Sequence, residues 1–492
     1  MALNTNIGPE RVQVFDEALG AILVPGAATS VAGFVIGTTQ AGAPVNAPTR
    51  ITTLEEFTST FGGPDEVAND AYYAIKGYYD NAGLGAAAII VNVGSSPTPA
   101  DYIGNAADSS GLRAFDSQDD LTLVSIPGLP LSEAYLVHGA LIDYSETVRA
   151  EFGATLSTVF SLLAMPKEIN AAQTDAVLTD DAKFVSVAGT GPYVITVDDG
   201  AAGDPDISAA TPGMIIRDLA ASFEATITAV DDVANTITIA TDPAATFTAG
   251  DTVRILTPSA ITYKESVINN PSRTAAWYFN NVNVLDEAAA ANPGDILAVD
   301  PVGHVAGVMA RIDQNAQIGG VSHAPAGIQF AGIAGIQGLS LSLSERLDGG
   351  PLRLAFINRI TSFPGAGNVI FGGYTADSGT SPALTAEEQL IQVVRTLQFI
   401  KRSLEPGLRA FLWENFSPAT QAAVQRAIES FLRNNIYLFP AGLTEANQFR
   451  VISVEPTQDE LSVGLLRVRV QIRPNTAVRF IEISLEFPLP TA

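Results

Sequence analysis

Four pairs of adjacent aspartates have the type and spacing that acid–base chemistry could use. They are Asp119-Asp120, Asp180-Asp181, Asp198-Asp199 and Asp231-Asp232. Catalysis at a glycosidic bond needs two carboxylates that converge on one substrate. Adjacent residues of a strand point to opposite faces, so most of these pairs would not converge. The pairs are typical of solvated turns, in which aspartate bonds the nearby backbone.

Metal chemistry finds little support in the sequence. The stretch from Asp198 to Asp206 offers oxygens for a calcium ion, but its spacing does not match a calcium loop. His138, His304 and His323 each lack the second histidine four residues away that a zinc-binding helix requires. The chain has no cysteine, which excludes disulfides and thiolate sites. We therefore expect no metal, no cofactor and no catalytic residue, so the protein is predicted not to be an enzyme.

The 42 glycines of the chain do not form a nucleotide-binding motif. Neither the phosphate-binding lysine motif nor the dinucleotide fingerprint occurs, and Gly332-x-x-Gly335-x-x-Gly338 has no lysine and the wrong spacing. No Gly-x-Ser-x-Gly motif marks a hydrolase nucleophile. If the protein performs mechanical work, that work must come from folding or assembly energy.

Composition points to an assembly rather than to a nucleic-acid or membrane protein. The 492 residues carry a net charge of −26, which argues against phosphate binding. Charged residues make up only 16% of the chain and hydrophobic ones 47%, which favours a surface buried between subunits. The longest apolar runs, such as Ala86–Val91, are far below the ~18 residues of a membrane span. We expect neither membrane insertion nor a signal peptide.

Strands that alternate with helices predict an open, mostly parallel α/β sheet. The predicted strands are Ser30–Gly37, Ala86–Val91, Leu121–Ile126, Thr158–Met165 and Ala275–Phe279. The predicted helices are Asp65–Asn81, Leu131–Phe152 and Gly303–Asp313. Between residues 171 and 260 the pattern changes to short strands divided by turns, with 13 acidic and 3 basic residues. This segment, with runs such as Tyr193–Val197, Ala225–Val230 and Thr236–Ile239, predicts a small antiparallel barrel or sandwich on the outer surface.

The last hundred residues predict two amphipathic helices followed by three strands. The second helix begins at Ser417-Pro418, an N-cap residue and a proline at the first helical position. Leu466–Arg473 alternates between apolar and cationic residues, and Ile481–Phe487 alternates again close to the end of the chain. A strand-like piece, Glu10–Asp16, lies at the other end. Chain ends fray unless something holds them, so both ends are predicted to add strands to a neighbouring subunit.

The order of these segments resembles the tail sheath proteins of contractile phage tails and related contractile injection systems. The resemblance rests on Ser30–Gly37, Ile51–Phe57, Leu123–Gly128, Gly303–Asp313, Ala324–Gly327, Arg395–Leu404 and the C-terminal strands. It does not cover residues 171–259. It implies a structural subunit that polymerises around an inner tube and contracts from a metastable extended state. A surface-layer or secreted protein with an acidic calcium- or glycan-binding β domain is the alternative, and an enzyme is a third.

The resemblance also implies a domain plan for the chain. Residues 1–26 would be an N-terminal arm, 27–170 and 261–375 two parts of the α/β core, 171–260 the inserted all-β domain, and 376–492 an α+β assembly domain completed by terminal arms. Val24–Gly26 and Arg473–Asn475 would be flexible linkers. The expected partners are further copies of the chain, the inner tail tube protein, and baseplate and tail terminator proteins, but no nucleic acid. The expected location is a phage tail, with assembly in the host cytoplasm, or a bacterial cytoplasmic injection system.

Three groups of residues are predicted to carry the assembly function. The arm strands would use Arg11, Val12, Val14, Phe15, Phe480, Ile481, Ile483 and Leu485. The receiving sheet would use Val451, Ile452, Leu466, Val468, Val470 and Ile472. A cationic group would face the tube, formed by Lys401, Arg402 and Arg409.

Overall fold

The computed structural model describes residues 24–477 apart from 150–156, 170–173, 176–181, 199–206, 208–209, 219–222, 244–248, 251, 268–270, 289–293, 338–349, 364, 366, 378–383, 454–456 and 458–463. The contacts within the chain divide it into two units. The larger unit comprises Ala27–Phe399 and Pro474–Ala492, and the smaller one Met1–Gly26 and Ile400–Arg473. Two boundaries fall at Gly26 and Arg473, inside the predicted linkers. The third falls after Phe399, and the domain plan given above stays a prediction.

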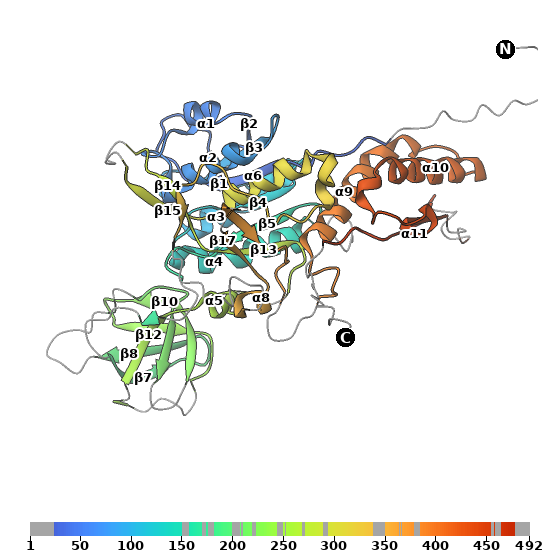
Figure 1. The fold of residues 1–492 in the computed structure, drawn as a ribbon. Helices are drawn as coiled ribbons and strands as arrows, with labels where there is room; N and C mark the ends of the chain where they lie inside the picture. The colour runs from blue at the N-terminus through green and yellow to red at the C-terminus, as the bar shows by residue number, and fades with distance from the viewer. Residues whose placement is uncertain are drawn as a thin grey trace, which may run out of the picture. The chain divides into compact units, whose positions relative to one another are not determined.

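An eight-stranded sheet forms the centre of the larger unit (Figure 1). Its order is β18 (Gly367–Phe371), β17 (Ile357–Phe363), β13 (Ala275–Phe279), β5 (Phe160–Ala164), β4 (Leu123–Ser125), β1 (Val31–Ile36), β3 (Ala87–Asn92) and β2 (Thr49–Ile51). The pairs from β17 to β3 are parallel, and only the edge strands β2 and β18 are antiparallel to their neighbours. The predicted mostly parallel α/β sheet is therefore confirmed.

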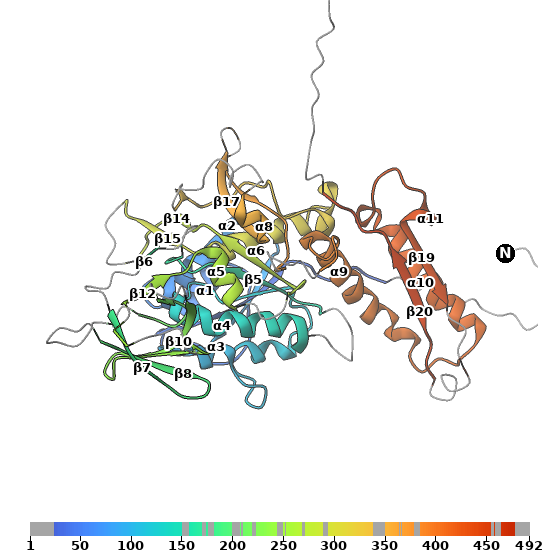
Figure 2. The same cartoon turned by 90° about the horizontal axis from the view of Figure 1, so that it is seen from below.

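Helices cover both faces of this sheet (Figure 1, Figure 2). On one face lie α2 (Ala71–Asn81) and α6 (Val302–Asp313), and on the other α4 (Leu131–Asp143) and α5 (Ala260–Val267). Alternate residues of β1 serve the two layers, since Phe34 packs into the first cluster and Val35 into the second. Shorter helices complete the unit: α1 (Leu54–Phe61), α3 (Pro99–Ile103) and α8 (Pro351–Leu354).

Glycines let α2 and α6 approach closely. A Cβ atom on Gly303 would lie 1.8 Å from the carbonyl oxygen of Ala74, and one on Gly307 would lie 2.5 Å from that of Tyr78. Gly77 of α2 makes room in turn for the imidazole of His304. The small residues that predicted a helix over Gly303–Asp313 therefore have a packing role.

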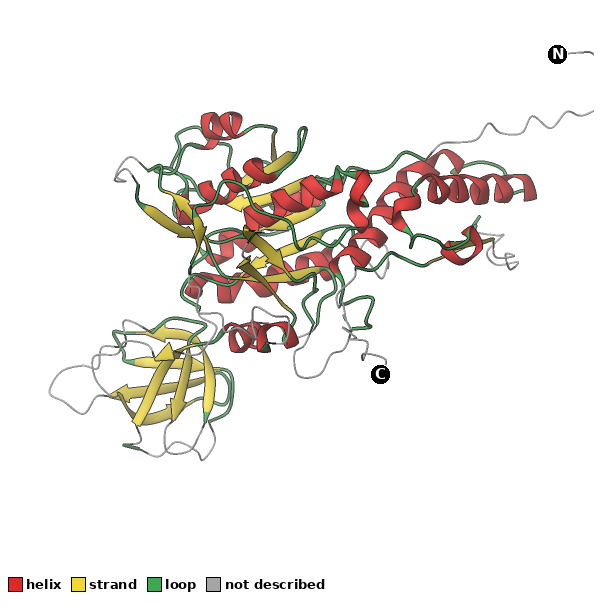
Figure 3. Ribbon diagram, in the orientation of Figure 1, coloured by secondary structure: helices red, strands yellow, loops and turns green. Residues whose placement is uncertain are grey.

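Residues 174–257 form a separate antiparallel sheet, seen as strands in Figure 3. Its strands are β6 (Thr174–Asp175), β7 (Ala182–Ala188), β8 (Tyr193–Asp198), β9 (Ile215–Asp218), β10 (Glu224–Asp231), β11 (Thr236–Ile239) and β12 (Thr252–Thr257). Because β12 pairs with both β7 and β9, the sheet closes into a barrel. Its interior holds a cluster that includes Ile195, Ile216, Ile227 and Ile237. The predicted short strands are present. A three-stranded sheet of β15 (Ile296–Val299), β14 (Val282–Leu285) and β16 (Gly335–Ile336) lies elsewhere in the unit.

Two predicted helices are shorter than expected. The helix predicted over Asp65–Asn81 begins only at Ala71, because Asn69 and Asp70 adopt left-handed backbone with φ angles of 56° and 60°. The sequence predicted a single helix over Leu131–Phe152, but α geometry ends at Asp143 and a π-helical turn follows over Tyr144–Val148. The turn places the side chains of Ser145 and Glu146 beside Thr274, a contact that local periodicity does not encode.

The smaller unit contains the second half of α9 (Ile391–Leu408), which begins in the larger unit, together with α10 (Pro418–Asn434) and α11 (Glu445–Gln448). Its strands are β19 (Phe449–Ser453) and β20 (Val468–Ile472). Among the described residues, no helix has both the length and the apolar character that crossing a bilayer requires.

Candidate functional site

The strands β19 and β20 form a two-stranded antiparallel sheet at the place predicted to receive arms. Phe449 lies opposite Ile472, Val451 opposite Val470, and Ser453 opposite Val468. Directly opposed residues point to the same side, so these apolar residues share one face, whereas Ile452, opposite Arg469, lies on the other. Arg450 and Arg469 are exposed on the other face. The apolar and cationic faces predicted from the alternation are both present.

Helix α10 supports the apolar face of this small sheet. The hydroxyl of Ser417 caps the helix by accepting a hydrogen bond from the Thr420 amide at 3.1 Å. Val424, Ile428, Phe431 and Leu432 are buried along one side of α10, which packs against β19. The ring of Phe449 lies 5.5 Å from that of Phe439. The apolar side of α10, which the sequence pattern predicted, therefore packs against β19.

Both strands have an edge that could accept another strand. In the described part of the chain, β19 and β20 pair only with each other. An isolated pair of strands is marginally stable, and its outer edges present unpaired main-chain groups. Val451 is buried, whereas Ile452, Val468, Val470 and Ile472 are half-buried, and Leu466 precedes β20. Five of the six predicted receiving residues thus lie on the two strands.

The predicted arm residues lie outside the described part of the chain. These are Arg11, Val12, Val14, Phe15, Phe480, Ile481, Ile483 and Leu485. Their role in strand addition stays a prediction. The cationic group predicted to face a tube is described, but its members differ in exposure. Arg409 is exposed and lies 3.9 Å from Glu405, Lys401 is half-buried, and Arg402 is 9% exposed.

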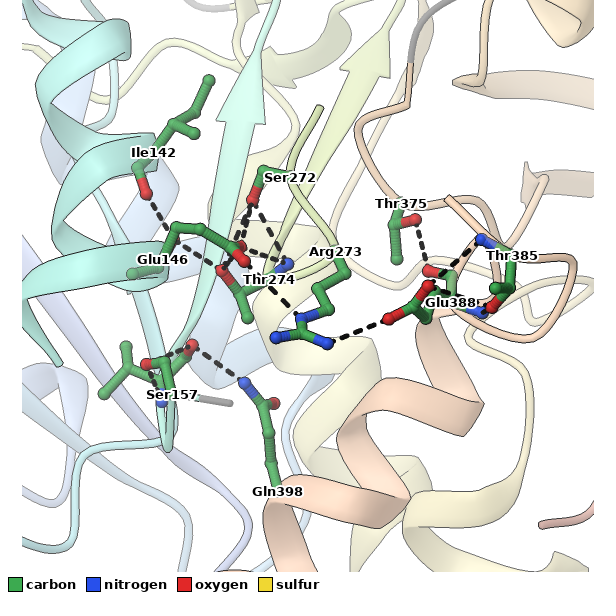
Figure 4. Close-up of polar contacts among 12 residues, drawn as sticks. Ile142, Glu146, Ser157, Ser272, Arg273, Thr274, Thr375, Thr385, Glu388 and Gln398 are labelled. Carbon is green, nitrogen blue, oxygen red and sulfur yellow. Dashed lines mark hydrogen bonds and ion pairs between the residues drawn. The ribbon is translucent and has the colours of Figure 1, made fainter. Parts of the chain in front are cut away.

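A polar network holds the segment before α9 to the α/β sheet (Figure 4). The π-helical turn after α4 presents Glu146, whose carboxylate accepts hydrogen bonds from the hydroxyls of Ser272 at 2.8 Å and Thr274 at 2.6 Å. Arg273 lies between two acids, with its Nε 3.5 Å from Glu146 and its Nη1 2.9 Å from Glu388. The network joins α4, the start of β13 and the approach to α9.

Glu388 belongs to a local cap as well as to this network. Its carboxylate accepts hydrogen bonds from the Thr385 amide at 3.1 Å and hydroxyl at 3.0 Å, while its own amide donates to that hydroxyl. The Thr385 amide, followed by the Thr385 hydroxyl and Arg273, holds the pKa of Glu388 below its usual value. The Thr-x-x-Glu spacing is a capping box that the sequence displays, although our sequence analysis did not use it.

A buried ion pair fixes the first turns of α9. Arg395 donates through Nη1 to Asp313 Oδ1 at 2.9 Å and through Nη2 to Oδ2, and the two side chains are 5% and 0% exposed. Nη2 also donates to the Thr29 carbonyl at 3.4 Å. One turn later, Gln398 donates to the Val159 carbonyl at 3.0 Å. Residues from the start of the core, from α6 and from α9 therefore meet at one point. No spacing signal in the sequence could have paired Arg395 with Asp313.

The residues considered for catalysis do not converge in the described part of the chain. Asp120 pairs with Arg50 on the surface, and Asp231 accepts a turn hydrogen bond from the Ala234 amide at 3.0 Å. Asp180 and Asp181 lie outside the described residues, as does most of the stretch from Asp198 to Asp206. No group of three or more potential metal ligands occurs among the residues that the structure places.

The histidines have packing roles instead. His138 is buried with Nδ1 3.0 Å from the Tyr263 hydroxyl, and burial lowers its pKa to about 3. His304 is enclosed between α6 and α2, and burial lowers its pKa to about 3 as well. His323 lies with Nδ1 2.6 Å from the Ala324 carbonyl oxygen.

Comparison with known proteins identifies the fold. No protein-family model matches the chain, and no curated protein matches it. A chain of the sheath complex of an extracellular contractile injection system, PVC, in the contracted state matches with a TM-score of 0.59 and 16% identity, over 99% of this chain and 98% of that one. The contracted helical sheath of the anti-feeding prophage matches with a TM-score of 0.58 and 18% identity, over 98% and 99% of the two chains.

The protein has the fold of a contractile sheath subunit. A chain of the anti-feeding prophage baseplate matches in the same way, with a TM-score of 0.57 and 17% identity over 98% of this chain and 100% of that one. The sheath resemblance inferred from the order of sequence segments is thus confirmed for the fold. These structures give no support to the surface-layer alternative.

Proposed function

We propose that this chain is the structural subunit of a contractile sheath. It would polymerise around an inner tube and shorten from a metastable extended state, driving the tube through a target envelope. The observation that carries the proposal is the match over nearly the whole chain to sheath subunits in the contracted state. We infer a role without catalysis, with further copies of the chain, a tube protein, and baseplate and terminator proteins as partners. The setting would be a phage tail or a bacterial contractile injection system.

The two-stranded sheet suits this task because strand addition joins subunits through main-chain hydrogen bonds. Such bonds depend little on side-chain sequence, and they can persist while a flexible linker changes direction. In this proposal, β19 and β20 receive the arms of neighbouring subunits, and the linkers around Gly26 and Arg473 absorb the rotation. The subunits would then stay connected while the sheath shortens.

The first turns of α9, in contrast to the linkers, are suited to staying in place. The Arg395–Asp313 pair and the network around Arg273 tie its first turns to the α/β sheet. Force applied to the receiving sheet would therefore reach the α/β unit through a helix that is held by buried contacts. In the same proposal the acidic barrel lies on the outer surface, and Lys401 and Arg409 face the tube. Arg402 is too buried for a direct tube contact by its whole side chain.

Electron microscopy of the purified protein tests this proposal. We expect hollow, striated cylinders, formed by the protein alone or with its tube protein. Two-dimensional lattices would instead favour a surface-layer protein. A monodisperse monomer that turns over a substrate would favour an enzyme, and either result would overturn the sheath proposal.

A further inference from the structure

A cavity of about 420 Å³ lies beside the start of α9 in the larger unit. The end of β18, the loop over residues 318–327 and the first turn of α9 form its walls, and apolar side chains dominate them. These are Ile318, Phe371, Tyr374 and Leu390. The cavity exceeds the volume of about 150 Å³ that holds a benzene molecule in an engineered protein core. It can therefore hold an aromatic side chain together with part of a main chain.

Gln392 lines this cavity with an amide that has no partner among the described residues. The residue is 1% exposed, and neither its Oε1 nor its Nε2 forms a hydrogen bond in that part of the chain. Gly373 faces the amide, since a Cβ atom there would lie 3.7 Å from Oε1. Nearby glutamines are satisfied: Gln389 donates to Asp377 at 2.9 Å and Gln398 to the Val159 carbonyl at 3.0 Å. Because a buried unpaired amide is costly, Gln392 indicates a ligand with both a donor and an acceptor.

The chain itself passes along this cavity. Asn475, Thr476 and Ala477, the last described residues, contribute to its lining. The sequence continues with Val478, Arg479 and Phe480. Three residues of extended chain span at most about 10 Å, so Phe480 is within reach of the cavity. A peptide main chain also offers the carbonyl and the amide N–H that Gln392 lacks.

The alternation of the C-terminal segment separates Phe480 from the other apolar residues of the predicted arm strand. Ile481, Ile483, Leu485 and Phe487 would share one face of an extended strand. Phe480 would lie on the opposite face, with Glu482, Ser484 and Glu486. A phenylalanine on a face that is otherwise polar needs a separate apolar partner.

We propose that this cavity is the docking site of Phe480 from the same chain, with the Gln392 amide bonded to the main chain of residues 478–480. Docking fixes the point at which the C-terminal segment leaves the α/β unit, and it orients residues 481–487 away from that unit. The proposal concerns a single chain, so it does not rest on sheath assembly and fails or holds independently of the proposed function.

Trypsin cleavage after Arg479 provides the first test, on the full-length subunit before assembly. Release of the peptide 480–492, followed by mass spectrometry, reports how often the segment leaves the cavity. Phe480→Ala and Gln392→Leu should each accelerate this release by about tenfold or more, because proteolysis tracks the open population. Phe487→Ala is the matched control and should leave the rate unchanged. Circular dichroism verifies that each variant is folded. Equal rates for all variants would overturn the proposal.

Disulfide trapping provides the second test. The chain has no natural cysteine, so only the introduced cysteines can form a disulfide. Arg479→Cys combined with Ala324→Cys on the cavity wall should form an intramolecular disulfide, seen as a faster band on a non-reducing gel. Arg479→Cys combined with Leu84→Cys, at a fully exposed position, should not. No bond in the first pair, or bonds only between two chains, would contradict docking of the chain's own segment.

Discussion

The β-sheets of the two units differ in how deeply their strands are buried and in how their edges are covered. In the larger unit, β1 and β3 are buried along their whole length, and antiparallel strands close both edges of the sheet. In the smaller unit, β20 alternates between half-buried and exposed residues, and its sheet has only two strands in the described part of the chain. The first sheet is complete within one chain, whereas the second has the properties of a sheet completed by another. This difference is what the proposed strand addition at β19 and β20 requires.

Breaking the buried ion pair should have the largest effect on the larger unit. Arg395→Met removes the guanidinium that pairs with the buried carboxylate of Asp313 and should lower the free energy of unfolding by about 3–5 kcal/mol. The double variant Arg395→Met/Asp313→Leu should recover most of this loss. Arg433→Met is the control in the smaller unit, where the pair with Glu445 is about half exposed and solvent screens it, so this variant should cost far less. Urea denaturation measures all three, and similar losses for both single variants would refute the distinction.

Overpacking the α2–α6 contact should have the next largest effect. Gly303→Ala places a methyl group against the Ala74 carbonyl, so we expect a loss of about 1–3 kcal/mol or more. Gly139→Ala in α4 is the matched control, because the nearest atom to its new Cβ lies 3.9 Å away. Alanine is the better helix former, so this control should be neutral or stabilising by up to about 1 kcal/mol. A thermal melt that ranks the two variants in reverse would show that the helices are not packed this closely.

A smaller effect should depend on pH. Burial raises the pKa of Asp300 to about 6, although amide donors from Gly128 and Val302 oppose the shift. The folded-state pKa thus exceeds the unfolded value of about 3.9, so folding favours the protonated acid. Its contribution to stability is full below pH ~4 and is lost as the pH rises through ~6. Asp300→Asn should flatten this dependence by up to about 2 kcal/mol in urea titrations at pH 4 and 7. An unchanged pH profile would contradict the assignment.

Removing the barrel should have the smallest effect on assembly. Residues 171–259 interrupt a sheet that resumes at β13, and their interior cluster is separate from the two clusters of the α/β sheet. A chain that replaces them with a short Gly-Ser bridge should still form cylinders by negative-stain microscopy. If this chain is folded but never assembles, the barrel belongs to the lattice and its proposed outer position is wrong.

Local patterns in the sequence predicted the elements well, and long-range contacts not at all. The strands at Ala275–Phe279 and Thr236–Ile239 have the predicted bounds, because a short apolar or alternating run between turns defines them. The end of α4 was missed because Glu146 has its partners 126 and 128 residues away. The Arg395–Asp313 pair spans 82 residues, and the unpaired amide of Gln392 is visible only once its surroundings are placed. Such contacts depend on how elements pack, which periodicity does not encode.

The central claim is that the chain folds alone but needs its terminal segments to join other subunits. Two truncated chains test it most directly, one that lacks Ala2–Asp16 and one that ends at Asn475. Each lost strand would leave unpaired main-chain groups at every subunit contact, at about 1 kcal/mol or more per buried group. We predict near-native circular dichroism and thermal midpoints, with sedimentation as small species and no cylinders by electron microscopy. Sheaths of normal length from either truncated chain would contradict strand exchange, and a collapse of the thermal midpoint would show that the segments complete their own subunit.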